Sequence, residues 1–269
     1  MPGTNKLGVG RVPGDLLGAP VEGGADNESD AASHSTGILP SQGIEHLIRA
    51  SREIVALEPI QGDQIQPASL DLRLGSVAYR VRASFLPGKN ARVEDRLADL
   101  EMHKMDISAG AVLERGCVYI VPLLEGLALK RRTSAMGNPK SSTGRLDIFT
   151  RLITDYGTEF DRVREGYSGP LYVEVSPRTF SVLVRKGSRL SQIRIRRGSP
   201  PTGDQTLQRL QEEHQLVDSI TADAIRDGVP VSMDLAGDRS GGVIGYKAKS
   251  HTGLIDVDRL RHYEVHDFW

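Results

Sequence analysis

Short segments in which apolar and polar residues alternate run through the middle of this chain, and glycines or prolines separate them. Between Ile65 and Gly75, three leucines alternate with charged residues, which is typical of a half-buried strand that ends at a glycine. Further short strands are predicted at residues 77–85, 111–114, 117–121, 146–153, 171–176, 180–185 and 190–196. Many short strands with few helices predict a mainly β fold, a barrel or a sandwich, rather than a parallel sheet.

The segment before this region has a different composition. Residues 1–36 are rich in Gly, Asp, Ser and Ala and show little apolar periodicity, so we expect a disordered leader. The β-rich domain is then assigned to residues 37–198. It is predicted to begin with a helix over about 42–56, capped by Ser41, because apolar residues recur there at helical spacing.

A second boundary follows the last predicted strand. The run Gly198–Gly203 contains two adjacent prolines, which indicates a linker. Residues 199–269 are therefore assigned to this linker, a helix and two strand-like pieces, at 205–215, 229–235 and 242–248. Because the sequence stops on the apolar pair Phe268–Trp269, we expect this part to be the truncated start of a second, similar domain.

Composition excludes several classes of protein. The 269 residues carry a net charge of −1, which gives no overall bias toward nucleic acid or membrane partners. No apolar run is long enough to span a bilayer and no secretion signal is recognisable, so a cytoplasmic location is expected. The single cysteine, Cys117, rules out an internal disulfide and the zinc deaminase signature H-x-E…P-C-x-x-C. The seven histidines show no convincing zinc spacing, so zinc chemistry is not expected.

The run Asn138–Arg145 concentrates groups that bind anions. Pro139 commonly opens a helix, and the hydroxyls and free main-chain N–H groups after it are components of an anion cradle. Lys140 adds a point charge, and Arg145 adds a planar fork suited to phosphate. A helix cap with solvated charges explains the same residues, so the segment alone leaves both interpretations open.

A carboxylate interrupts an apolar strand further along the chain. Leu171, Val173 and Val175 share one face of the predicted strand, and Tyr172, Glu174 and Ser176 share the other. If buried, Glu174 is a candidate general base; if the sheet has one wet face, it is a solvated side chain.

Seven basic residues and no acidic one lie between 178 and 197. Such a run could neutralise a polyphosphate. It suits nucleic acid less well, because aromatic residues are scarce in it.

Together these segments resemble the dCTP deaminase branch of the dUTPase-like superfamily, most closely its long members with two tandem domains. The residues that carry the resemblance lie in Ile65–Gly75, Pro139–Arg145, Gly166–Glu174 and Gly187–Ile193. The resemblance implies a distorted β-barrel or jelly roll with a few short helices, and zinc-independent hydrolysis of dCTP to dUTP and ammonia for thymidylate synthesis. Mg²⁺ is implied as a companion of the triphosphate. A homotrimer with active sites shared between subunits is also implied.

The resemblance also assigns roles to residues. It makes Glu174 the catalytic general base, Tyr172 and Val173 part of the base pocket, and Gln192 a nucleotide contact. The triphosphate segment that it implies consists of Lys140, Ser141, Ser142, Thr143, Gly144 and Arg145.

One position departs from the family pattern. Arg164 stands where related enzymes carry the aspartate that contacts the deoxyribose, which argues against dUTPase activity. The acids that could take over the sugar contact are Asp155, Glu159, Asp161 and Glu165, and the sequence does not choose among them. A lid over the phosphates has only weak candidates, at Tyr246, Lys247 and Lys249.

Two alternatives to a plain deaminase remain open at this point. One is a bifunctional deaminase and diphosphatase that releases dUMP. The other is a nucleotide-binding regulatory module without turnover.

Overall fold

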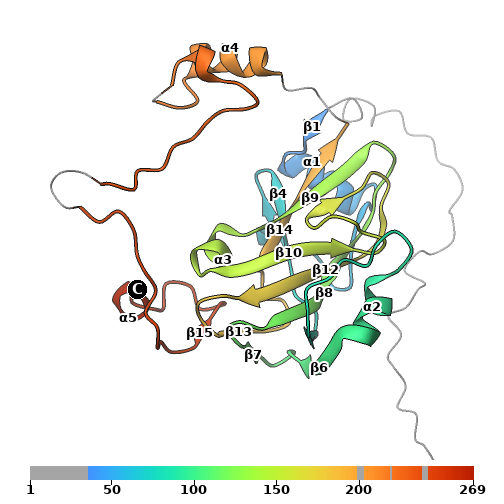
Figure 1. Ribbon diagram of the computed structural model, residues 1–269. Helices are drawn as coiled ribbons and strands as arrows, with labels where there is room; N and C mark the ends of the chain where they lie inside the picture. The colour runs from blue at the N-terminus through green and yellow to red at the C-terminus, as the bar shows by residue number, and fades with distance from the viewer. Residues whose placement is uncertain (1–35, 199–202, 219, 238–241) are drawn as a thin grey trace, which may run out of the picture. The chain divides into compact units, whose positions relative to one another are not determined.

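The computed structural model describes residues 36–198, 203–218, 220–237 and 242–269 (Figure 1). Two sheets make up most of the fold. The first has six strands in the order β11-β9-β14-β4-β3, with β1 pairing at the side of β14. The bounds of these strands are β1 Gly37–Ile38, β3 Ile65–Gln66, β4 Ser69–Leu72, β9 Thr133–Pro139, β11 Arg162–Val163 and β14 Ser191–Arg197.

The second sheet also has six strands, in the order β10-β12-β8-β5-β6, with β2 pairing with β8. The long strands β8 and β12 lie side by side in its middle, as Figure 1 shows. All neighbouring strands in this sheet are antiparallel. The bounds are β2 Ile54–Ala56, β5 Val77–Val81, β6 Glu101–Asp106, β8 Val118–Ala128, β10 Ile148–Thr154 and β12 Ser168–Pro177.

A third, three-stranded sheet and short helices complete the described part. The sheet has the order β15-β13-β7 and contains a parallel pair, β13 with β15. Its strands are β7 Ala111–Leu113, β13 Val182–Val184 and β15 Ile255–Asp256. The helices are α1 Ser41–Arg49, α2 Val93–Leu100, α3 Ser141–Arg145, α4 Asp204–His214 and α5 Val265–Phe268, with the 3₁₀ helices η2 Gly62–Gln64 and η3 Ala222–Ala224.

One hydrophobic core joins all three sheets. Leu70 and Ile193 of the first sheet, Val121 and Val173 of the second, and Val182 of the third belong to a single cluster of buried side chains. A smaller cluster, which includes Tyr172, lies on the opposite face of β12 and packs against α2. Successive residues of β12 therefore enter different cores, as the period of a strand requires.

These observations confirm a mainly β fold with a few short helices. Three local predictions were wrong. The helix predicted over 42–56 ends at Arg49, because Arg52 takes a left-handed φ of 51° and the chain enters β2. The strand predicted over 117–121 continues through Pro122 to Ala128 as β8. On the neighbouring strand β12, the pairing register shifts between Pro170 and Tyr172, and Tyr172 pairs with Pro122.

The third error concerns the strand-like pieces at 229–235 and 242–248, which form no strand. Strands need a neighbour for their main-chain groups, and no strand of the described part pairs with these residues. Apolar side chains there, such as Val231 and Met233, are exposed. The predicted leader lies outside the described residues, apart from Thr36.

Candidate active site

Glu174 lies in the middle of the second sheet, on β12. Its register partners are Arg151 on β10 and Ile120 on β8. The side chain is buried, with 1% of its surface exposed. The interpretation of Glu174 as a solvated side chain on a wet sheet face therefore does not hold.

The carboxylate of Glu174 uses its two oxygens differently. Arg151 donates two hydrogen bonds to Oε1, from Nε at 3.1 Å and from Nη2 at 2.6 Å. Oε2 is buried and has no hydrogen-bond partner among the described residues. Arg151 and Glu174 thus form an ion pair through one carboxylate oxygen. One oxygen is thus held in place while the other remains able to accept a proton.

Aromatic and hydroxyl groups orient Arg151. Its guanidinium carbon lies 3.6 Å from the ring centroid of Phe160 and 5.0 Å from that of Phe149, both in cation–π geometry. Nη2 also donates to Oγ of Ser84 at 2.6 Å. The arginine that faces the candidate base is therefore held by contacts from several segments. Sequence reasoning missed Arg151, although a charged residue inside the apolar run 148–153 is the same signal that singled out Glu174.

The two residues assigned to the base pocket point to opposite sides of β12. Tyr172 is buried in the smaller cluster, and its hydroxyl lies 3.5 Å from Oε1 of Glu94 on α2. Burial, followed by the nearby charge of Asp155, raises the pKa of Tyr172, so it stays a neutral phenol. Val173 faces the main core. A nucleotide could therefore meet Val173 only at its main chain.

The triphosphate segment begins where β9 ends. Lys140 is the N-cap residue of α3, and its ammonium forms an ion pair with the buried carboxylate of Asp71 on β4. Ser141, Ser142, Gly144 and Arg145 are exposed, whereas Thr143 is buried. Three hydroxyl or cationic side chains of the segment are thus accessible to a ligand, and the hydroxyl of Thr143 is less so.

Gln192 lies beside this segment. On β14 it pairs with Asn138 of β9 on one side and with Asp71 of β4 on the other. Its Oε1 accepts a hydrogen bond from Ser69 at 2.8 Å, and its Nε2 donates to the carbonyl of Pro139 at 3.4 Å. The first sheet therefore brings together Gln192, Lys140 and the strand that contains Asp71.

The site residues predicted from sequence thus form two groups on different sheets. Glu174, Tyr172 and Val173 lie on β12, and the segment 140–145 lies with Gln192 at the end of β9 and β14. Within the described residues, no hydrogen bond or ion pair joins one group to the other. The structure therefore presents a candidate chemical centre and a candidate anion site as separate groups.

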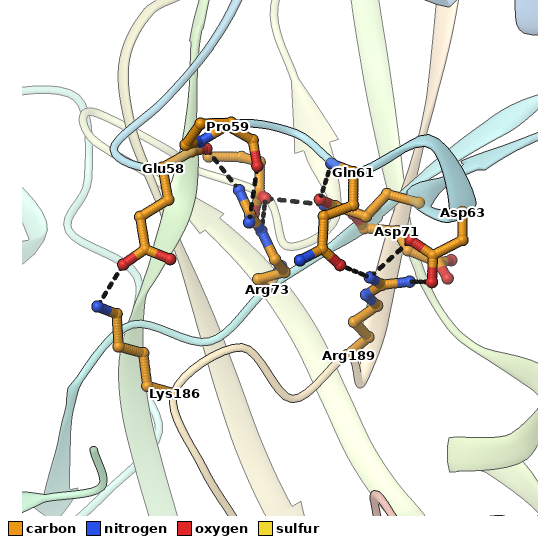
Figure 2. A network of polar contacts seen from close by, with 10 residues as sticks. Glu58, Pro59, Gln61, Asp63, Asp71, Arg73, Lys186 and Arg189 are labelled. Atoms are coloured by element: carbon orange, nitrogen blue, oxygen red, sulfur yellow. Dashed lines mark hydrogen bonds and ion pairs between the residues drawn. The ribbon is translucent and has the colours of Figure 1, made fainter.

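A polar network braces the loop next to the anion site (Figure 2). Arg73 is buried and donates to Glu125 at 2.7 Å and to the carbonyls of Pro59 and Glu58 at 3.1 and 2.8 Å. Arg189 lies between Gln61 and Asp63, at 2.7 Å from Oε1 of Gln61 and 2.9 Å from Oδ2 of Asp63. The strand predicted to be half-buried is in fact fully buried, because ion pairs neutralise its charged residues.

The same network bears on the basic run 178–197. Lys186 pairs with Glu58, and Arg189 pairs with Asp63. Arg185 pairs with Asp256 at 2.7 Å. At least three of the seven cations are thus engaged with carboxylates of the described residues, so the run does not present a continuous basic face for nucleic acid.

The four acids considered for the sugar contact lie in different environments. Asp155 is buried and accepts the main-chain N–H of Val93 at 2.8 Å. Glu159 forms an exposed pair with Arg162, and Glu165 is exposed, as is Arg164. Asp161 is half-buried and close enough to Arg151 and Glu174 for their charges to act on it. Asp161 is therefore the acid of this set whose pKa responds to the charge of Glu174.

The described residues contain no group of three or more His, Cys, Asp and Glu side chains that could hold a metal ion. In this same part of the chain, every helix is too short or too polar to cross a membrane.

Comparison with known proteins identifies the family. Residues 35–199 match the family model of the 2′-deoxycytidine 5′-triphosphate deaminase (DCD) N-terminal domain, and residues 203–269 match that of the C-terminal domain. The N-terminal model alone spans more than half of the chain. The chain therefore belongs to the dCTP deaminase family, and its enzyme class is that of a dCTP deaminase, a hydrolase.

Individual relatives agree with this assignment. A crystal structure of 2′-deoxycytidine 5′-triphosphate deaminase from Agrobacterium tumefaciens is 51% identical, with a TM-score of 0.80, over 88% of this chain and 70% of that one. A dCTP deaminase, dUMP-forming, from Coprothermobacter proteolyticus is 27% identical over 58% of this chain and 80% of its own length. A native EIAV dUTPase is 14% identical over 36% of this chain and 74% of that one, with a TM-score of 0.29, which is too low to support an argument.

Proposed function

We propose that this protein hydrolyses dCTP to dUTP and ammonia, with Glu174 as the general base. The observation that carries the proposal is the asymmetric carboxylate of Glu174. Arg151 binds one of its oxygens, and the other is buried without a partner in the described part of the chain. A carboxylate held in place through one oxygen, with the other oxygen unengaged, is what proton transfer from a water molecule requires.

The chemistry balances with one water molecule and one base. Glu174 Oε2 removes a proton from water while the water oxygen bonds to C4 of the cytosine ring, which gives a tetrahedral carbon. The same carboxyl then returns the proton to the exocyclic nitrogen. The C4–N bond breaks, ammonia leaves, and the proton that remains on the C4 hydroxyl moves to N3, so C4 becomes a carbonyl and the nucleotide is dUTP. Arg151 holds the carboxylate through Oε1 before the transfer and compensates its charge again at the end.

The triphosphate is proposed to bind at residues 140–145, with Mg²⁺ carried on the nucleotide as part of the substrate. Arg145 and the hydroxyls of Ser141 and Ser142 are exposed there. Lys140 would be shared between the phosphates and Asp71, with which it pairs in the free protein. Gln192, held by Ser69 and Pro139, would contact the nucleotide.

We further propose a homo-oligomer, a trimer by resemblance, whose active sites combine the two groups from different subunits. The separation of the groups on two sheets supports this proposal. Sedimentation of the purified chain in the presence and absence of dCTP tests it, and a monomer active at all concentrations contradicts it.

Glu174→Gln is the decisive test of the mechanism. The amide cannot accept a proton, so ammonia release should fall by at least about 100-fold, while calorimetry should still detect dCTP binding. Glu114→Gln is the matched control, because Glu114 is an exposed acid that pairs with Arg80. Deamination by Glu174→Gln at the wild-type rate would show that another group is the base.

A second candidate is the bifunctional reaction that ends in dUMP. The printed activity of the Coprothermobacter relative, a dUMP-forming dCTP deaminase, favours it. Chromatography of the products of dCTP and Mg²⁺ separates the two. Accumulated dUTP supports the deaminase alone, whereas dUMP with pyrophosphate supports the bifunctional enzyme.

A further inference from the structure

Asp161 ties together three strands next to the candidate chemical centre. Its main-chain N–H donates to the carbonyl of Leu152 on β10 at 2.9 Å, and its Oδ1 accepts the N–H of Leu152 at 2.7 Å. Its own carbonyl accepts the N–H of Gly137 on β9 at 2.7 Å, and β11 begins at the next residue. Asp161 therefore holds both main-chain polar groups of Leu152 and connects β10 to β9.

The junction around Asp161 is tight. A Cβ atom on Gly137 would lie 2.6 Å from Cβ of Leu152, so β9 and β10 approach as closely as they do only because residue 137 is glycine. Asp161 itself has a left-handed φ of 63°, a conformation that aspartate tolerates better than most residues. The position of β10 is thus fixed on this side by one aspartate and one glycine.

The residues that Asp161 fixes are those that orient Arg151. Leu152 directly follows Arg151, so the clamp on Leu152 sets where the arginine leaves the strand. Phe160, directly before Asp161, lies against the guanidinium at 3.6 Å. Arg151 is thus held through its main chain and through its ring contact, both from the segment 160–161.

Charge couples the same three groups. Burial raises the pKa of Asp161. The hydrogen bond from the N–H of Leu152 and the charge of Arg151 oppose this effect, and the charge of Glu174 adds to it. These two are the charged side chains that act on Asp161, Arg151 from β10 and Glu174 from β12. The cation therefore lies in the field of two carboxylates, and it bonds only one oxygen of Glu174.

We propose that Asp161 is a positioning residue for Glu174 and acts through Arg151. Asp161 fixes the main chain of β10 and places a second carboxylate near Arg151. Together these two effects direct the guanidinium to Oε1 of Glu174 and leave Oε2 free to take the proton from water. This inference rests on the proposed role of Glu174 as the base. It assigns to Asp161 no contact with the substrate.

Two variants separate the parts of this role. Asp161→Ala removes both the acceptor for Leu152 and the charge, and kcat for ammonia release should fall about 100-fold, the scale expected when a reacting group is misplaced by about 1 Å. KM for dCTP should stay unchanged, because no substrate contact is lost. Asp161→Asn keeps an acceptor oxygen for Leu152 but removes the charge, so its kcat should fall less. Its kcat–pH profile should also differ from that of the wild type, because burial raises the pKa of Asp161 and the amide of the variant does not titrate.

Asp106→Asn is the matched control. The carboxylate of Asp106 also accepts a main-chain N–H, from Ser108 at 2.8 Å, but it is exposed. Neither kcat nor the pH profile should change in this variant. ¹³C NMR of labelled aspartate in the full chain is a readout that does not need turnover. The carboxyl signal that Asp161→Asn removes should titrate above the usual range of aspartate in the wild type and in Asp106→Asn.

The outcomes distinguish this inference from the proposed function. Wild-type kcat and pH profile in both Asp161 variants, with Glu174→Gln inactive, would overturn the inference and leave the function standing. A loss of kcat that matches the loss of folded protein, with an unchanged kcat–pH profile, shows a structural role and also overturns it. If the wild type releases no ammonia, the proposed function fails. An Asp161 signal that titrates within the usual range of aspartate would separately contradict the buried environment on which the inference rests.

Discussion

Replacing Arg73 with methionine should destabilise the protein by about 3–5 kcal/mol, because it leaves a buried carboxylate without its cation. The side chains of Arg73 and Glu125 are 5% and 0% exposed, and Nε of Arg73 lies 2.7 Å from Oε1 of Glu125. After the substitution, Glu125 keeps only the N–H of residue 73 and Nε2 of Gln64, at 2.7 and 2.9 Å. Two neutral donors do not replace a guanidinium in a site closed to water.

The same substitution also releases the loop before η2. Arg73 donates to the carbonyls of Glu58 and Pro59, which lose these hydrogen bonds. For a domain of this size, each kcal/mol of lost stability lowers Tm by roughly 2–4 °C. The expected fall in Tm is therefore about 6–20 °C, with the lower end favoured if water enters the loop.

Urea unfolding followed by circular dichroism measures the change in the free energy of unfolding. Arg80→Met is the matched control: Arg80 pairs with Glu114 at 3.2 Å, but the two side chains are 39% and 60% exposed, so its loss should cost less than about 1 kcal/mol. The double variant Arg73→Met with Glu125→Leu should recover part of the stability, because it removes the stranded charge. An Arg73→Met variant as stable as Arg80→Met would refute the reasoning.

Two further changes test other parts of the fold. Gly137→Ala should destabilise the protein by about 1–3 kcal/mol, because the new Cβ would lie 2.6 Å from Cβ of Leu152. Gly62→Ala is the control, because a Cβ there meets nothing within 4 Å. Equal free energies of unfolding of the two variants in urea would show that β9 and β10 are not packed so closely at Gly137. Arg185 lowers the pKa of Asp256 from 3.8 to about 2. The ion pair therefore stabilises the pairing of β15 with β13 fully above about pH 4, and this stabilisation is lost as the pH falls toward 2. Hydrogen-exchange protection of the amides of Ile255 and Val257, corrected for intrinsic rates, should decline over that range, and constant protection to pH 2 would refute this.

The sequence predicted those features that depend on the period of a single strand. Alternation along β12 placed Val173 and Tyr172 on opposite faces, and they indeed belong to different cores. The same alternation misjudged β4, whose residues are all buried. A charged residue in an alternating strand is normally solvated, and only a partner from a distant segment, such as Glu125 for Arg73, makes its burial tolerable.

Features that depend on pairing between segments were beyond single-sequence reasoning. Arg151 faces Glu174 because β10 and β12 pair in one particular register. A shift by one residue would turn Arg151 to the other face of the sheet. The register in turn depends on where Asp161 and Gly137 fix β10, which no local pattern reveals. Helix α2 was not predicted, although the sequence contains the signal for it. Val93, Leu97 and Leu100 recur at helical spacing.

The position of Glu174 also explains why a charged centre can exist in this sheet at all. β12 has neighbours on both sides, so a glutamate on it has no route to bulk water through a sheet edge. Its charge must then be balanced within the sheet, and Arg151 on the adjacent strand is the group that does so. Because Arg151 binds one oxygen only, the balance stabilises the charge without filling the acceptor. The arrangement that makes burial tolerable therefore leaves open the oxygen that the proposed reaction needs.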